Sequence, residues 1–236
     1  LPLQEQIDRD DINVQMLVIT PGRELALQSS EVLKNMKCGV RGMACYGGRP
    51  AMDEHRRMRD VNPQIVFATP GRLLDHLEKG NILCDNVRFL VIDEFDKCLE
   101  MGFAREMNAI VGFLADDCRR ILLSATDLDA IPNYVNMGRT AKLSFLVDEE
   151  QTNDRVETYL VKCEQKDKLP MLSLLLSEVS NESCIVFLNY RDSVERVSDY
   201  LRDNGFPHVV FHGGLDQRQR EQALYQFSNG SVNIMV

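Results

Sequence analysis

Short apolar runs alternate with amphipathic segments along almost the whole 236-residue chain, and this alternation restricts the fold more than any other feature. The runs are rich in Val, Ile, Leu and Phe, and they lack the polar–apolar alternation of a strand that faces water on one side. Continuous apolar strands separated by helices indicate a parallel sheet covered on both faces, and therefore an α/β fold. In the first part of the chain the runs occupy residues 14–20, 40–46, 64–69, 87–93 and 119–126.

The alternation pauses at an acidic, polar stretch and then starts again, which predicts two α/β domains joined by a linker. We expect a first domain at residues 1–147, a linker at 148–154 and a second domain at 155–236. The chain ends on "VNIMV", a buried-strand pattern, so we expect a fragment in which both domains are incomplete. Strands of the second domain are expected at residues 156–163, 183–189, 208–214 and 232–236.

Helical periodicity predicts which side chains the helices bury. In "ELALQSSEVLKNM" the residues Leu25, Val32 and Met36 lie near one face, which we expect to pack on the sheet. The basic stretch at residues 54–60, "EHRRMRD", could touch a nucleic acid, but a solvated helix face is the favoured interpretation.

Composition excludes some classes of function. No apolar run reaches the 18 residues that a membrane span needs. Seven scattered cysteines without a CxxC pair favour reduced thiols in a cytoplasmic protein, and the four histidines lie at no zinc-ligand spacing. The net charge of −9 argues against a globally basic nucleic-acid binder, so any such site must be a local face. Nothing in the sequence demands more than a monomer.

An acidic turn, "VIDEFD" at residues 91–96, follows one of the buried strands. In a parallel α/β sheet, ligands lie beyond the carboxyl ends of the strands, where Asp93 and Glu94 fall. One carboxylate there could hold Mg²⁺ and its neighbour could activate a water molecule. Alone, the stretch favours the simpler alternative of a solvated strand end.

Three further turns follow predicted strands. "LLSAT" places Ser124 and Thr126 at a strand tip, where such hydroxyls often only cap the next helix. The tetrapeptide Thr-Pro-Gly-Arg occurs at residues 20–23 and again at 69–72, each time between a strand and a helix. Helix N-terminal amides together with an Arg can bind phosphate, although two ordinary turns would look the same.

The set and order of these motifs resemble the DEAD-box RNA helicases of superfamily 2. The resemblance covers nearly the whole chain and rests on "TPGRELALQ" (20–28), "YGG" (46–48), "TPGRL" (69–73), "VIDEFD" (91–96), "SAT" (124–126), "IVFLNYR" (185–191) and "HGGLDQRQR" (212–220). It implies two RecA-like parallel-sheet domains in tandem that use ATP and Mg²⁺ and bind RNA. The paired TPGR turns favour this family over related DNA translocases.

The resemblance also implies roles for individual residues. Asp93 would hold Mg²⁺, largely through water, and Glu94 would activate the hydrolytic water. Asp96 would bond to the segment Ser124, Ala125 and Thr126 and couple hydrolysis to domain closure. Backbone contacts to RNA, with low sequence specificity, would come from Pro21, Gly22, Arg23, Gly48, Thr69, Gly71, Arg72, Asn189, Arg191, Gly213, Gln217 and Arg220.

The chain departs from the family pattern in two ways. Phe95, Gly22, Tyr190 and Gly214 replace the usual Ala, Thr, Thr and Asp. No G-x-x-x-x-G-K-[ST] phosphate loop and no arginine-finger motif occur in the 236 residues, so we expect an enzyme in the intact parent but no ATPase activity in this piece. The alternative is a nucleotide-free RNA clamp or interaction module derived from the helicase fold.

Overall fold

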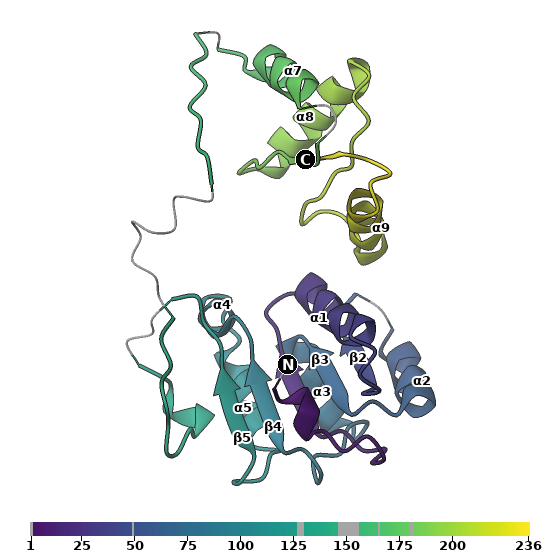
Figure 1. Ribbon diagram of the computed structural model, residues 1–236, viewed down its shortest axis with the longest axis vertical. Coiled ribbons are helices and arrows are strands. Elements are labelled where there is room, and N and C mark those ends of the chain that lie inside the picture. Colours follow the sequence, from purple (N-terminus) through teal and green to yellow (C-terminus); the bar gives the residue numbers. More distant parts are fainter. Residues whose placement is uncertain (1, 49, 127–129, 146–155, 165, 180–181) are drawn as a thin grey trace. The chain divides into compact units, whose positions relative to one another are not determined.

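The computed structural model describes residues 2–48, 50–126, 130–145, 156–164, 166–179 and 182–236 (Figure 1). The chain divides into two compact units, residues 1–141 and 142–236, which are treated separately below. The predicted linker at 148–154 lies outside the described residues. None of the described helices is long and apolar enough to cross a membrane.

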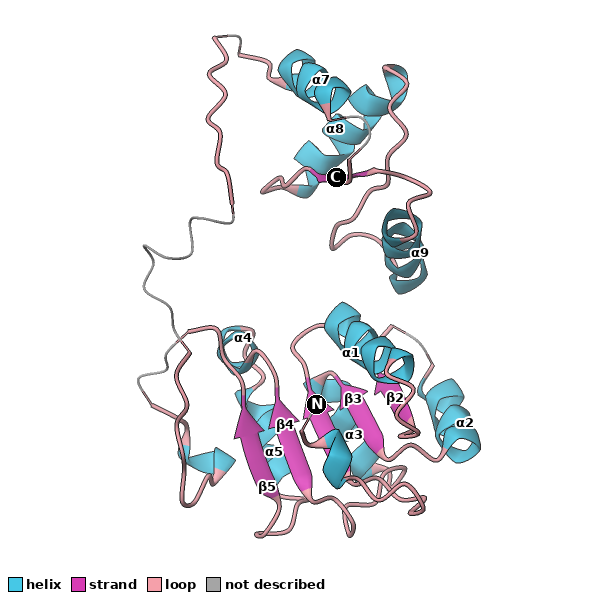
Figure 2. Ribbon diagram, in the orientation of Figure 1, coloured by secondary structure: helices cyan, strands magenta, loops and turns pink. Residues whose placement is uncertain are grey.

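The first unit is built on a five-stranded parallel sheet, shown in magenta in Figure 2. Its strands lie in the order β2-β3-β1-β4-β5, so the first strand of the chain lies in the centre. The predicted α/β fold with a parallel sheet is confirmed. The strands are β1 (Met16–Ile19), β2 (Gly42–Cys45), β3 (Ile65–Ala68), β4 (Phe89–Ile92) and β5 (Arg119–Leu122).

Both faces of the three central strands, β3, β1 and β4, are buried, as the continuous apolar runs predicted, whereas the outer strands β2 and β5 are partly exposed. Along β1, Leu17 and Ile19 point into one core cluster, whereas Met16 and Val18 point into the other. Successive side chains of a strand point to opposite faces, so a strand covered on both sides must be apolar throughout. The surrounding helices are α1 (Arg23–Asn35), α2 (Ala51–Val61), α3 (Pro70–Glu78), α4 (Phe95–Glu100) and α5 (Ala104–Val111), with 3₁₀ turns η1 (Gln4–Gln6) and η2 (Asn133–Val135).

Helix α1 buries a different face from the predicted one. Its buried side chains are Ala26 and Leu33, whereas Val32 is 48% and Met36 38% exposed, so the prediction for these residues was wrong. The cause is the packing partner. Leu33 lies over Gly42 of β2, where an added Cβ would be only 2.5 Å from the leucine Cδ2, and the missing side chain of Gly42 therefore fixes which face of α1 approaches the sheet.

The second unit contains a smaller parallel sheet. Strands β6 (Cys184–Ile185) and β7 (Ile234–Met235) pair in parallel, and Val209 forms a parallel bridge to Met235. Its helices are α7 (Leu169–Glu178), α8 (Arg191–Asp203) and α9 (Gln217–Ser228). Side chains from α7, α8 and β7 form its main core, which includes the fully buried Leu201.

Residues 156–163, predicted as the first strand of the second unit, form no strand and appear as a loop in Figure 2. Leu160 is 86% and Tyr159 79% exposed. A strand needs a neighbour that pairs with its N–H and C=O groups, and the described residues of this unit provide no ladder for this segment. The apolar pattern alone therefore did not decide its conformation.

Candidate active site and nucleic-acid interface

The parallel register brings the carboxyl ends of the first unit's strands to one edge of its sheet. Backbone hydrogen bonds extend just past the strand ends: Asp93 N–H donates to Ile19 O at 2.9 Å, and Leu123 N–H donates to Ile92 O at 2.9 Å. Thr20 N–H likewise donates to Ala68 O at 3.0 Å. The turns that carry the predicted site residues of this unit therefore share this edge, as expected for ligand sites in α/β sheets.

The acidic turn after β4 exposes Glu94 in a strained conformation. Glu94 has φ +46° and caps α4, and its N–H donates to Asp93 Oδ1 at 3.0 Å. A non-glycine residue in the left-handed region costs on the order of 1 kcal/mol. Asp93 is half-buried and Glu94 is exposed, so two neighbouring carboxylates face the edge with different surroundings.

Phe95, the residue that departs from the family pattern, points the other way. Its side chain is 0% exposed and belongs to the main core cluster. Its N–H donates to Leu123 O at 2.9 Å, which joins the start of α4 to the end of β5. The larger side chain is therefore accommodated in the core, on the opposite side of the backbone from Glu94.

Asp96 contacts the turn after β5. It is only 4% exposed, and its Oδ2 accepts a hydrogen bond from Thr126 Oγ1 at 2.8 Å. Ser124 Oγ donates to Thr126 O at 2.8 Å and so holds that turn closed. The Thr126 hydroxyl first of all, and then the Lys97 backbone and the Ser124 hydroxyl, keep the pKa of Asp96 below its ordinary value, although burial opposes them.

The two Thr-Pro-Gly-Arg turns precede helices with open N-termini. In the first, Thr20 Oγ1 donates to Gly22 O at 3.1 Å, and Arg23 begins α1. In the second, Thr69 caps α3 and Pro70 occupies its first turn. An added Cβ on Gly22 or Gly71 would meet nothing within 4 Å, so both backbones are open to a ligand.

The Tyr46–Gly48 turn lies beside the first of these turns. An added Cβ on Gly47 would lie 3.5 Å from the Arg23 guanidinium, so the side chain of Arg23 extends over that glycine. Gly48 has φ +91°, a conformation that favours glycine.

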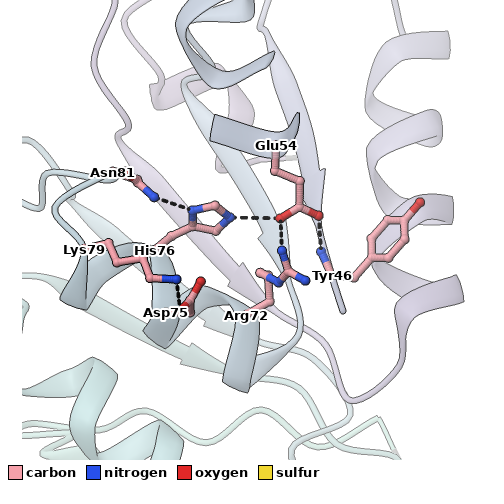
Figure 3. A network of polar contacts seen from close by, with 7 residues as sticks. All are labelled: Tyr46, Glu54, Arg72, Asp75, His76, Lys79 and Asn81. Atoms are coloured by element: carbon pink, nitrogen blue, oxygen red, sulfur yellow. Dashed lines mark hydrogen bonds and ion pairs between the residues drawn. The ribbon is translucent and has the colours of Figure 1, made fainter. Parts of the chain in front are cut away.

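A buried polar network joins the second Thr-Pro-Gly-Arg turn to the Tyr46–Gly48 turn, and sequence reasoning missed it (Figure 3). Glu54 of α2, 4% exposed, accepts hydrogen bonds from Tyr46 N–H at 3.0 Å, Arg72 Nη1 at 3.1 Å and His76 Nε2 at 2.9 Å. The interpretation of residues 54–60 as a solvated face is thus wrong for Glu54. The available signal was its position one turn before the buried Met58.

In the second unit, the predicted residues have different environments. Asn189, Arg191 and Gly213 are exposed, whereas Gln217 is 6% exposed and its Nε2 donates to Glu221 Oε1 at 3.1 Å. Arg220 stacks over the Phe211 ring with its Cζ 5.0 Å from the ring centroid.

A small network surrounds Gly214, another departure from the family. Gly214 N–H donates to His212 Nδ1 at 3.0 Å, and His212 Nε2 contacts Glu195 Oε1 at 2.9 Å. An added Cβ at Gly214 would lie 2.4 Å from Arg191 Cζ, so this guanidinium occupies the space that a side chain at 214 would need.

Comparison with known proteins agrees with this arrangement. The DEAD/DEAH box helicase family model matches residues 1–130, and the helicase conserved C-terminal domain matches residues 167–236. The chain belongs to the DEAD/DEAH box helicase family.

Named relatives include two bacterial proteins. The chain is 34% identical over 239 aligned residues to "ATP-dependent RNA helicase DbpA" of Escherichia coli, covering 100% of this chain and 52% of that protein. It is 35% identical to "ATP-dependent RNA helicase CshA" of Listeria monocytogenes, covering 100% of this chain and 46% of the relative. The chain thus spans about half the length of the curated relatives that it matches.

Solved structures show the same fold. Saccharomyces cerevisiae Dbp5 bound to RNA and ADP BeF3 matches with a TM-score of 0.84 and 22% identity, over 99% of this chain and 60% of that one. The helicase Mss116 bound to ssRNA and UDP-BeF matches with a TM-score of 0.80 and 25% identity, over 99% of this chain and 52% of that one.

Proposed function

We propose that this chain serves in an ATP-dependent RNA helicase that couples ATP hydrolysis to local unwinding of RNA duplexes or remodelling of RNA–protein complexes. The observation that carries the proposal is the membership of residues 1–130 in the DEAD/DEAH box helicase family, with an acidic turn at the carboxyl edge of the sheet. The names of the relatives DbpA and CshA support the same activity.

We assign a RecA-like fold to both domains and place them at residues 1–147 and 155–236, with a linker at 148–154. Family matches at residues 1–130 and 167–236 and the division into two compact units support two domains, although that division falls between residues 141 and 142, before the proposed linker. We also propose that the protein is a cytoplasmic monomer. Its seven cysteines, an odd number at scattered positions, favour reduced thiols and so support that compartment.

The residues at the acidic turn fit a magnesium–nucleotide site. Asp93 offers carboxylate oxygens, which Mg²⁺ prefers, and its Oδ1 is oriented by the Glu94 N–H. When bound, the metal would neutralise charge on the ATP phosphates. Asp93 would hold Mg²⁺, largely through water, while the exposed Glu94 carboxylate would orient the attacking water and accept its proton.

Asp96 would transmit the state of this site to the segment Ser124, Ala125 and Thr126. The hydrogen bond from Thr126 Oγ1 to Asp96 supports this role, because it joins the acidic turn to the turn from which the chain continues beyond β5. A movement of the acidic turn would therefore also move the segment at the end of β5. Ser124→Ala combined with Thr126→Ala should separate hydrolysis from unwinding, and equal loss of both activities would contradict the coupling role.

RNA would bind through its backbone at the open helix N-termini and glycine turns. Pro21, Gly22, Arg23, Gly48, Thr69, Gly71 and Arg72 would serve in the first unit, and Asn189, Arg191, Gly213, Gln217 and Arg220 in the second. The structures of Dbp5 and Mss116 bound to RNA support RNA as the partner. Backbone amides and a few arginines would allow binding despite the net charge of −9.

The 236-residue chain should not hydrolyse ATP by itself, because its sequence holds no phosphate loop and no arginine-finger motif. Such a finger contributes roughly 10³–10⁵ to the rate. The test is to measure phosphate release and the anisotropy of a labelled single-stranded RNA with the purified chain. We expect RNA binding without turnover, and RNA-stimulated hydrolysis would refute the predicted inactivity.

Two further results separate the proposal from the nucleotide-free clamp. In a longer form of the protein that carries a phosphate loop, Glu94→Gln should abolish hydrolysis and spare ATP-dependent RNA binding. Unchanged turnover would remove Glu94 from catalysis. RNA binding that never responds to ATP, even in the longer form, would favour the clamp, and no RNA binding at all would contradict both.

A further inference from the structure

Glu54 is a buried carboxylate whose surroundings stabilise its charge. Its side chain is 5% exposed, and its two oxygens accept three hydrogen bonds from Tyr46 N–H, Arg72 and His76. A buried charge is costly unless it is paired and hydrogen bonded. Protein groups, and not solvent, therefore supply these hydrogen bonds to the carboxylate.

The histidine of this network completes the hydrogen bonds of the carboxylate. His76 Nε2 lies 2.9 Å from Glu54 Oε2, and Asn81 Nδ2 lies 3.1 Å from His76 Nδ1 on the other side of the ring. His76 is 0% exposed, and Asn81 N–H donates to its carbonyl at 2.9 Å. Asn81 and His76 together thus hold Glu54 in one orientation, and Arg72 supplies the compensating positive charge.

The network connects two turns at the carboxyl edge of the sheet, and a third turn lies against one of them. Glu54 holds the backbone of Tyr46, where the Tyr46–Gly48 turn begins, and the side chain of Arg72, in the second Thr-Pro-Gly-Arg turn (Figure 3). The Arg23 guanidinium lies over Gly47. One acidic side chain on α2 therefore fixes the spacing between segments that are far apart in sequence.

A metal site is the competing use of these residues. Ligand atoms of Cys45, Glu54 and His76 all lie within 4.8 Å of one another. Because the guanidinium of Arg72 already pairs with Glu54 at 3.1 Å, the arrangement fits an organic cation better than a metal ion.

We propose that Glu54 is a positioning residue that holds Arg72 and the Tyr46–Gly48 turn in the geometry that binds the RNA backbone. This inference rests on the proposed RNA-binding function. The Arg72 side chain is 13% exposed, so it is anchored on its inner side and reaches the surface at the edge. A guanidinium has five N–H donors, and a bond to Glu54 is compatible with a further bond to a phosphate oxygen.

The test compares Glu54→Gln with Arg72→Ala and with the double variant, using the 236-residue chain and a labelled single-stranded oligouridylate at low salt. Simple electrostatics predicts that removing an anion near RNA strengthens binding. Positioning predicts the opposite: Glu54→Gln should weaken binding about 10-fold, as loss of a charge-assisted contact would. It should also make the negative slope of log affinity against log salt less steep by about 0.7, although Glu54 itself touches no phosphate.

The double variant identifies the route of the effect. If Glu54 acts through Arg72, Glu54→Gln should cause no further loss in the Arg72→Ala background. Asp75→Asn is the matched control, because it removes the ion pair with Lys79, 2.6 Å away at the C-terminal cap of α3, without removing any contact of Glu54. It should leave affinity and salt slope unchanged. Unchanged or stronger binding by Glu54→Gln, or an additive loss, would overturn the inference.

A measurement without RNA separates this inference from the proposed function. In nitrogen-15 NMR spectra, the Nη1 protons of Arg72 should exchange with water slowly in the wild-type chain and rapidly in Glu54→Gln. The backbone amide spectrum should remain that of a folded protein in both. The same exchange in both proteins would overturn the inference even if RNA binds. Failure of the wild-type chain to bind RNA would overturn the proposed function, and the inference with it.

Discussion

Removing the Thr126 hydroxyl tests whether its bond to Asp96 stabilises the acidic turn. Thr126→Val keeps the shape of the side chain and deletes the donor that lies 2.8 Å from Asp96 Oδ2. Asp96 is 4% exposed, but Thr126 is exposed, so water can replace part of the lost bond. A hydrogen bond to a charged group contributes about 1.5–3 kcal/mol, and we expect the lower end, which changes the unfolding equilibrium about 10-fold.

The loss should depend on pH. The Thr126 hydroxyl is the largest of the effects that keep the pKa of Asp96 below its ordinary value. A carboxyl whose pKa is lower in the folded state stabilises the fold above its unfolded pKa of about 3.9, and this stabilisation is lost as the pH falls through the folded pKa. The difference in the free energy of unfolding between wild type and Thr126→Val should be largest at neutral pH. It should become smaller in acid, below the unfolded pKa of Asp96.

The assay is pulsed hydrogen exchange with mass spectrometry along a urea series, which reports the unfolding of residues 89–126 separately from the second unit. Thr126→Ser keeps the hydroxyl and is the control, expected to unfold near the wild-type urea concentration. Two results would refute the reasoning. One is a urea midpoint of Thr126→Val equal to that of wild type at neutral pH, and the other is a loss of stability that is just as large in strong acid.

Three other substitutions or reactions test the packing. Gly42→Ala should destabilise the first unit by about 1–3 kcal/mol, because the new Cβ would lie 2.5 Å from Leu33 Cδ2, and a thermal melt at the wild-type temperature would contradict this. Leu201→Ala, at a fully buried site, should cost the second unit about 2–5 kcal/mol in urea denaturation and leave the first unit unchanged. Cys98 should resist iodoacetamide at mildly alkaline pH in the folded chain, because burial first of all, and then Glu94, raise the pKa of its thiol to about 12. Rapid labelling, read by mass spectrometry, would contradict its burial.

Much of the first unit could be predicted from local pattern. Apolar runs without polar alternation require burial on both faces, and that requirement leads to parallel strands flanked by helices. The acidic turn and the Thr-Pro-Gly-Arg turns were each predicted at a strand end, and the parallel sheet brings these ends to one edge. The roles assigned to Asp93 and Glu94 remain predictions.

Other features depended on which strands became neighbours. The face of α1 was mispredicted because Leu33 is selected by the missing side chain of Gly42, a residue that follows the helix in sequence and belongs to β2. Residues 156–163 carry an apolar pattern but no ladder partner among the described residues, and a strand cannot be defined by one segment alone.

The sequence by itself determined the fold class and the family, because strand period, turn chemistry and motif order can all be read along the linear chain. Only the tertiary structure decided the environment of Glu54. Its partners Tyr46, Arg72 and His76 come together because β2 and β3 are adjacent in the sheet, so that α2 and α3 meet at its edge. In the sequence, Glu54 belongs to a charged helix. Once buried, it becomes the centre of a network that orients Arg72, the proposed RNA-binding arginine.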